Sequence, residues 1–191
     1  MGRKKTNPNK IPLAKKTFDA EELVAEITDK TVLKGWALFL GALADFKGTS
    51  SQSISHLWNN VYAYTASVSA ETSIADSLAY IEKITGLSMP YQELSTGKIK
   101  TKGDLDRFIR RANRNALHTF FSIIAEPIVN KHLLSEEDIP LAFRKAYALD
   151  DEVAQGYITI RDLLDILEEE YCICLTEIDG QVELRCLDSS I

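Results

Sequence analysis

Seven cationic residues lie between positions 98 and 114, a stretch that holds only Asp104 and Asp106 as acids. At about 100° per residue, a helix would bring the arginines and one histidine of this stretch onto a single arc about 100° wide. Arginine forks bind phosphates and carboxylates in pairs of hydrogen bonds. We therefore predict an anion- or partner-binding face made of Arg107, Arg110, Arg111, Arg114 and His118. The alternative is a solvated face, or one whose cations pair internally with the acidic last third of the chain.

A second basic feature is the N-terminal segment, where residues 1–16 carry six cations and no acid. Pro8 and Pro12 oppose a helix, so we expect an extended arm. Short basic arms can follow a phosphate backbone, and each contact makes the affinity more dependent on salt. Arg3, Lys4 and Lys5 are the candidates for such contacts. The arm can equally serve as a solubilising tail.

The opposite charge gathers at the other end, where residues 135–191 carry 15 acids against four bases. Two helices and a hairpin in this region loosely resemble a winged helix-turn-helix, but phosphates would repel its second helix. An acidic face could instead occupy a basic groove on a partner, in place of nucleic acid. The alternative is a solvated surface. The residues of this predicted acidic partner surface are Asp162, Asp165, Glu168, Glu169 and Glu170.

Catalytic and metal-binding patterns are weak. The three histidines are isolated, and Ser95-Thr96-Gly97-Lys98 resembles the end of a phosphate loop but lacks its upstream glycine. Cys172, Cys174 and Cys186 are expected on one face of terminal strands, which suits small buried side chains as well as zinc ligands, and no fourth ligand is apparent. We therefore expect no catalytic residue, no metal and no cofactor.

The elements that must position these residues follow from hydrophobic periodicity. We expect a basic arm over 1–16, a helical domain over 17–170, and a β-hairpin with a short tail over 171–191. The fold class is mainly α, an irregular bundle of six to seven helices with a small C-terminal β-hairpin. Asp104 should cap the helix that carries the arginines, and Pro127 should end or kink it. The expected helices cover about 19–28, 30–47, 52–67, 70–85, 104–126, 135–148 and 159–170.

Composition limits the setting of the protein. Hydrophobic residues make up 45% of the 191 residues and charged residues 26%, as in ordinary globular proteins. Neither an apolar segment long enough for a membrane helix nor a secretory signal is apparent. The odd number of cysteines does not suggest a disulfide framework. We expect a cytoplasmic protein without a membrane partner.

Three segments resemble a group of small proteins encoded by phages and prophages of Gram-positive bacteria. They are 2–13 (GRKKTNPNKIPL), 86–91 (GLSMPY) with the helix that follows to 119, and 135–138 (SEED). The resemblance implies a mobile-element accessory protein and no particular active site.

Three hypotheses follow for function. The first is a non-catalytic accessory protein that binds and modulates a host machine, protein or ribonucleoprotein, for example an inhibitor of a defence nuclease of the anti-CRISPR type. The second is a nucleic-acid-binding protein that uses the arm and the arginine face. The third is an enzyme with an unrecognised site.

Overall fold

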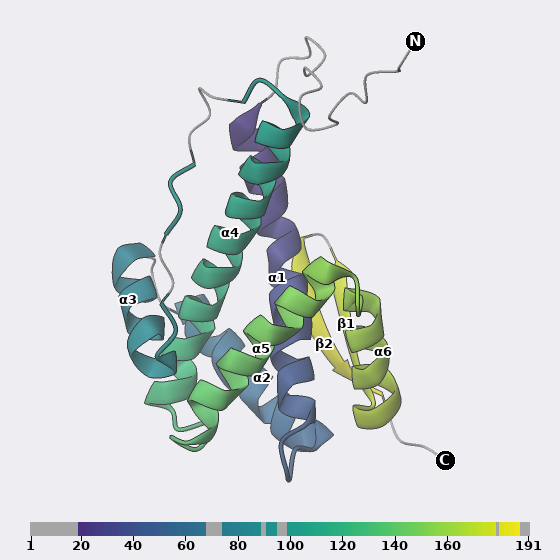
Figure 1. Cartoon of the computed structure of the whole chain (residues 1–191). Coiled ribbons are helices and arrows are strands. Elements are labelled where there is room, and N and C mark those ends of the chain that lie inside the picture. Colours follow the sequence, from purple (N-terminus) through teal and green to yellow (C-terminus); the bar gives the residue numbers. More distant parts are fainter. Residues whose placement is uncertain (1–18, 68–73, 89–90, 95–98, 179, 188–191) are drawn as a thin grey trace.

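The computed structural model describes residues 19–67, 74–88, 91–94, 99–178 and 180–187. These residues form six α-helices followed by one antiparallel hairpin, which confirms the predicted fold class (Figure 1). No helix of the described part combines the length and the apolar character needed to cross a membrane. The elements are α1 (Ala20–Ala44), α2 (Ser51–Ser67), α3 (Ile74–Thr85), α4 (Lys102–Asn130), α5 (Asp138–Gln155), α6 (Ile160–Tyr171), β1 (Ile173–Ile178) and β2 (Gln181–Cys186).

Helix α1 is continuous, so the prediction of two helices broken near residue 29 is wrong. The segment contains neither proline nor an exposed glycine at that point, and its threonines do not interrupt the helix. The hydroxyls of Thr28 and Thr31 donate to the carbonyls of Val24 and Ile27, one turn back, at 2.8 and 2.7 Å. Asp19 caps the start by accepting from the amides of Glu21 and Glu22.

The core forms around α1, which packs against α4, α5 and α6. Phe39 of α1, Phe121 of α4 and Phe143 of α5 are fully buried, with ring centroids 4.9 to 6.4 Å apart. A Cβ on Gly35 would lie 2.3 Å from Cδ1 of Phe120, so glycine is what allows α1 and α4 to approach this closely. Helices α1 and α4 begin at the same end of the molecule, the upper end of Figure 1.

Helix α4 starts earlier and ends later than the sequence suggested. Its N-cap is Thr101, whereas the predicted cap, Asp104, is the third residue of a capping box with Thr101. The helix also continues through Pro127 to Asn130. Proline has no backbone N–H to donate to the preceding turn. The helix nevertheless continues, because Pro127 lies in its last turns and is buried.

Helix α6 begins at a side-chain cap, whereas the N-cap residue of α5, Glu137, makes no side-chain hydrogen bond and a capped turn precedes it. Ser135 accepts from the amide of Asp138 ahead of α5, and Thr159 accepts from the amide of Asp162 at the start of α6. Helix α5 extends beyond the predicted end near 148, because nothing stops it before Gly156, which adopts a positive φ of 78°.

The hairpin pairs Ile173 with Cys186 and Cys174 with Arg185. Directly opposed residues of an antiparallel pair project to the same face, so Cys174 and Cys186 lie on opposite faces. The prediction that the three cysteines share one face is therefore wrong. Ile173, Leu175 and Val182 are buried in the same core cluster as the helices, so the hairpin packs as part of the helical body.

Candidate anion-binding surface

The predicted arginine face lies on the first half of α4, where all four arginines are exposed. This half of the helix has one buried side and one exposed side. Phe108 and Ala112 are buried, at 5% and 3% exposure, and the arginines lie on the other side. The amphipathic pattern of the sequence therefore positions the guanidinium groups toward solvent. The four exposed arginines are Arg107, Arg110, Arg111 and Arg114.

The arginines differ in whether they have a partner. The structure describes seven arginines, of which Arg107, Arg144, Arg161 and Arg185 each have a hydrogen bond or ion pair within the protein. The other three, Arg110, Arg111 and Arg114, have no ion pair or hydrogen bond among the described residues. All three lie on the same face of the same helix, which makes this face the largest group of uncompensated guanidinium groups in the described part of the chain.

Carboxylates in the last third of the chain form ion pairs with cations other than the arginines of α4. Asp150 lies 2.5 Å from Nζ of Lys34 on α1, Asp165 pairs with Arg161, and Glu183 pairs with Arg185. None of these ion pairs reaches α4. Internal neutralisation by the last third, the alternative raised by the sequence, is therefore not observed among the described residues.

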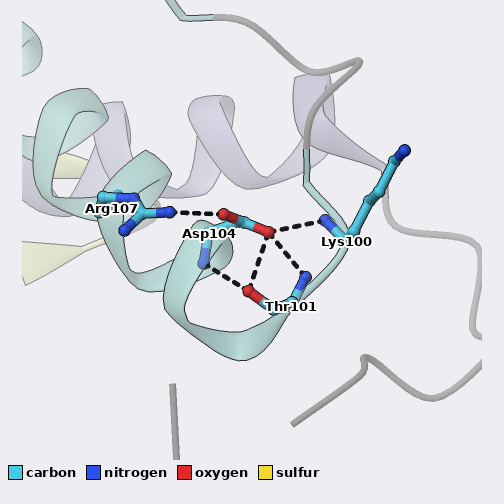
Figure 2. A network of polar contacts seen from close by, with 4 residues as sticks. All are labelled: Lys100, Thr101, Asp104 and Arg107. Atoms are coloured by element: carbon cyan, nitrogen blue, oxygen red, sulfur yellow. Dashed lines mark hydrogen bonds and ion pairs between the residues drawn. The ribbon is translucent and has the colours of Figure 1, made fainter. Parts of the chain in front are cut away.

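Arg107 is held at the start of α4 by a network around Asp104, shown in Figure 2. Asp104 Oδ2 accepts from the amides of Lys100 and Thr101 and from the Thr101 hydroxyl, at 3.2, 2.9 and 2.8 Å. Its Oδ1 accepts from Arg107 at 2.6 Å. The Thr101 hydroxyl, the two amides and Arg107 together lower the pKa of Asp104 to about 2. This carboxylate is therefore ionised at neutral pH and fixes both the cap and the Arg107 side chain.

A hollow of about 530 Å³ lies beside the arginine face, between α4 and the segments on either side of residues 95–98. Its α4 wall contains Arg107 and Arg111 with Asp104 and Phe108. The facing wall is lined by Gln92, Glu93, Leu94 and Ile99. Apolar and cationic groups therefore meet in one concave surface, next to the three arginines that have no partner.

Asn115 fixes the far wall of the hollow. Its Oδ1 accepts from the amide of Gln92 at 3.0 Å, and its Nδ2 donates to the carbonyl of the same residue at 2.7 Å. Asn115 is only 6% exposed, so these two bonds satisfy its buried side-chain amide. They also hold the backbone of Gln92, in the segment after α3, against α4. This contact was not predicted from the sequence, although an asparagine among the buried positions of an amphipathic helix is a usable signal.

His118 was predicted as part of the arginine face, and the structure corrects this. The side chain is 4% exposed, and its Nδ1 lies 2.9 Å from the hydroxyl of Tyr147 on α5. Burial, and then the positive charge of Arg114, lowers the pKa of His118 to about 4. His118 lies on the same arc of α4 as the arginines, but α5 covers the arc at this point along the helix, which periodicity alone cannot reveal. A neutral His118 therefore belongs to the core.

The predicted acidic surface of α6 is only partly free. Asp162 accepts from the amide and the hydroxyl of Thr159 as part of the N-terminal cap, and Asp165 pairs with Arg161 at 2.8 Å. The three acids of the last turn are exposed, and the helix has no basic residue in that turn. In Figure 1, α6 lies away from the first half of α4. The three exposed acids are Glu168, Glu169 and Glu170.

The remaining candidates from the sequence are the basic arm, the segment 95–98 and a metal site. Arg3, Lys4 and Lys5 of the arm, and Ser95 to Lys98, lie outside the described residues. Within the described part of the chain, no cluster of three or more histidine, cysteine or acidic side chains could hold a metal ion. No family model, curated protein or solved structure matches the chain.

Proposed function

We propose that this chain is a non-catalytic accessory protein that binds a polyanionic part of a larger machine through the first half of α4. The observation that carries the proposal is the contrast in pairing between Arg110, Arg111 and Arg114 and the other described arginines. An exposed arginine row without internal partners retains its charge and all of its donors for a ligand. Phosphates and clustered carboxylates are the groups that such a row binds best.

The setting of the proposal comes from the resemblance to accessory proteins of phages and prophages. In that setting the partner is a host machine, and its polyanionic part is a nucleic-acid component or an acidic protein surface. Inhibition of a defence nuclease, of the anti-CRISPR type, is the most concrete version. The three free acids at the end of α6 offer such a nuclease a second contact, in a basic groove.

A binding role is supported by how the polar groups of the site are used. Asp104, a carboxylate in the hollow, has both oxygens engaged by the cap and by Arg107. His118, the histidine on α4, is buried against Tyr147. General acid–base chemistry needs a group that can reach a substrate and exchange a proton near the working pH. Neither of these two side chains meets that requirement, and we infer that the surface binds rather than reacts.

Direct binding of nucleic acid is the second candidate function, and the same observation favours it. The full arginine face also includes Arg107, and its neighbours on the helix surface (107/110, 107/111, 110/114 and 111/114) are three or four residues apart, or about 4.5 and 6 Å along the helix axis. Such intervals suit a chain of phosphates. Contacts from Arg3, Lys4 and Lys5 would extend the same footprint.

The test is an affinity capture from the lysate of a Gram-positive host, scored for protein and nucleic acid, with and without nuclease treatment. The wild type is compared with R110Q/R111Q/R114Q and with the control K47Q/R161Q/R185Q. The control removes the same charge from exposed positions off α4. The proposal predicts a specific partner that the wild type and the control retain and that the α4 variant loses. Equal recovery by all three proteins, or no specific partner at all, would contradict it.

A further inference from the structure

Arg111 belongs to two features at once, because it lies in the arginine row and also lines the hollow beside it. A ligand bound to the row through Arg111 therefore lies at the mouth of the hollow. The hollow combines the apolar side chains of Leu94, Ile99 and Phe108 with the carboxylate of Glu93.

We propose that the ligand of this surface is a single-stranded nucleic acid, whose consecutive phosphates lie along Arg110, Arg111 and Arg114 while one unpaired base enters the hollow. This inference rests on the proposed function and names its ligand. A volume of about 530 Å³ accommodates a nucleobase with part of its sugar. A base presents flat apolar faces together with a polar edge, which matches the mixture of side chains in the hollow.

Glu93 favours a base over the other occupants. An apolar side chain of an acidic peptide would contact Leu94 and Ile99, but it has no donor for the exposed carboxylate of Glu93 beside them. The amino groups of adenine, cytosine and guanine do donate. A base pair in an intact duplex cannot enter, because its bases are stacked inside the helix. An unpaired strand is the polyanion that uses the row and the hollow together.

The edges of the hollow are already held in place. Asn115 fixes Gln92 through two hydrogen bonds, and Asp104 fixes the amides of Lys100 and Thr101. A ligand therefore does not have to order these edges, and less of its interaction energy is lost on binding. Arg107 is oriented in the same way by its ion pair with Asp104 and keeps a side-chain exposure of 63%.

The decisive experiment uses the unaltered full chain and three fluorescently labelled probes, with fluorescence anisotropy as the readout. The probes are a short single strand of mixed sequence, the same strand annealed to its complement, and the same strand with abasic sites throughout. The single strand should bind about 5- to 150-fold tighter than either of the others, which is the range expected for one stacked base. Because the comparison is between probes, it does not depend on whether a variant folds.

Two variants separate this inference from the proposed function. L94D places a third carboxylate in the hollow, beside those of Glu93 and Asp104, and should abolish the preference for the single strand, whereas R110Q/R111Q/R114Q should weaken all three probes. If the unaltered chain binds the duplex and the abasic strand as tightly as the single strand, but the arginine variant weakens all three, the base-binding inference fails and the proposed function stands. Binding of polyglutamate but of no oligonucleotide would likewise overturn the inference. If the arginine variant binds every probe like the unaltered chain, both fail.

Discussion

The arginine face of α4 and the acidic face of α6 look equivalent in the sequence, since each gathers four or five like charges on one helix. In the structure they differ in what the charges contact. Asp162 and Asp165 are engaged by the cap and by Arg161, whereas Arg110, Arg111 and Arg114 have no partner among the described residues. A cluster of like charges therefore indicates a binding surface only where its members are not already engaged by partners within the protein.

The largest expected effect comes from neutralising the three unpaired arginines. R110Q/R111Q/R114Q should lower the affinity for a polyanionic probe such as heparin by up to about 100-fold, at about 1 kcal/mol for each exposed contact. Its free energy of unfolding should stay within about 0.5 kcal/mol of the wild type, because these side chains form no hydrogen bond or ion pair with the described residues. Binding is measured by anisotropy competition and stability by urea unfolding. An affinity loss no larger than that of K47Q/R161Q/R185Q would remove the distinction between the two faces.

The second effect marks where the arginine face ends and the core begins. His118 is neutral in the folded protein, with a pKa of about 4, but takes up a proton near pH 6.5 when unfolded. The unfolded state therefore binds more protons as the pH falls below about 6.5, and the free energy of unfolding should decrease by at most roughly 3 kcal/mol before it levels off near pH 4.

Urea unfolding across this pH range checks the effect, with H118Q as the variant that cannot titrate. H118Q should show a shallower loss of stability on acidification than the wild type. R114Q should lie between them, because the charge of Arg114 contributes to the lowered pKa. Identical pH profiles for all three proteins would place His118 in solvent instead of in the core.

The third prediction uses two identical caps, Thr101 with Asp104 on α4 and Thr159 with Asp162 on α6. T101A and T159A should each lower the free energy of unfolding by about 1 kcal/mol, the usual cost of losing such a cap. Only T101A should also weaken polyanion binding, by about threefold, because Asp104 positions Arg107 and an edge of the hollow. Equal effects of both variants on binding would mean that the cap does not support the surface.

The smallest effect concerns the last turn of α6. Acids near a helix C-terminus interact unfavourably with the helix dipole, so E169Q/E170Q should raise the free energy of unfolding by a few tenths of a kcal/mol. Polyanion binding should change by less than about twofold, since this turn lies away from the arginine face (Figure 1). A strong loss of affinity in this variant would show that α6 takes part in the same site.

Local patterns were enough to predict much of the fold. The helical periodicity of α2, α6 and the arginine-bearing half of α4 agrees with the structure, as does the terminal hairpin with its turn at Gly180. Each of these elements is determined by residues close together in the chain. The continuity of α1 was missed, because Thr28 and Thr31 have weak helical propensity and their bonds to the preceding turn are visible only in three dimensions.

The candidate site was predicted in part, for a related reason. Exposure of the arginines follows from the amphipathic pattern of α4, but burial of His118 depends on α5, which contributes Tyr147. The hollow depends on the contact between Asn115 and Gln92, 23 residues apart. Contacts between distant segments of this kind leave no periodic signal in a single sequence, and so the sequence indicates the charges but not the space beside them.

The central claim is that three guanidinium groups on α4 are available to phosphates, and the salt dependence of binding tests it most directly. For a single-stranded probe, the slope of log Kobs against log salt concentration should be about 2 smaller in magnitude for R110Q/R111Q/R114Q than for the wild type, at about 0.7 per lost phosphate contact. K47Q/R161Q/R185Q should keep the wild-type slope. A slope that is the same in the wild type and the α4 variant would contradict the account, because it would mean that these arginines displace no counterions from the ligand.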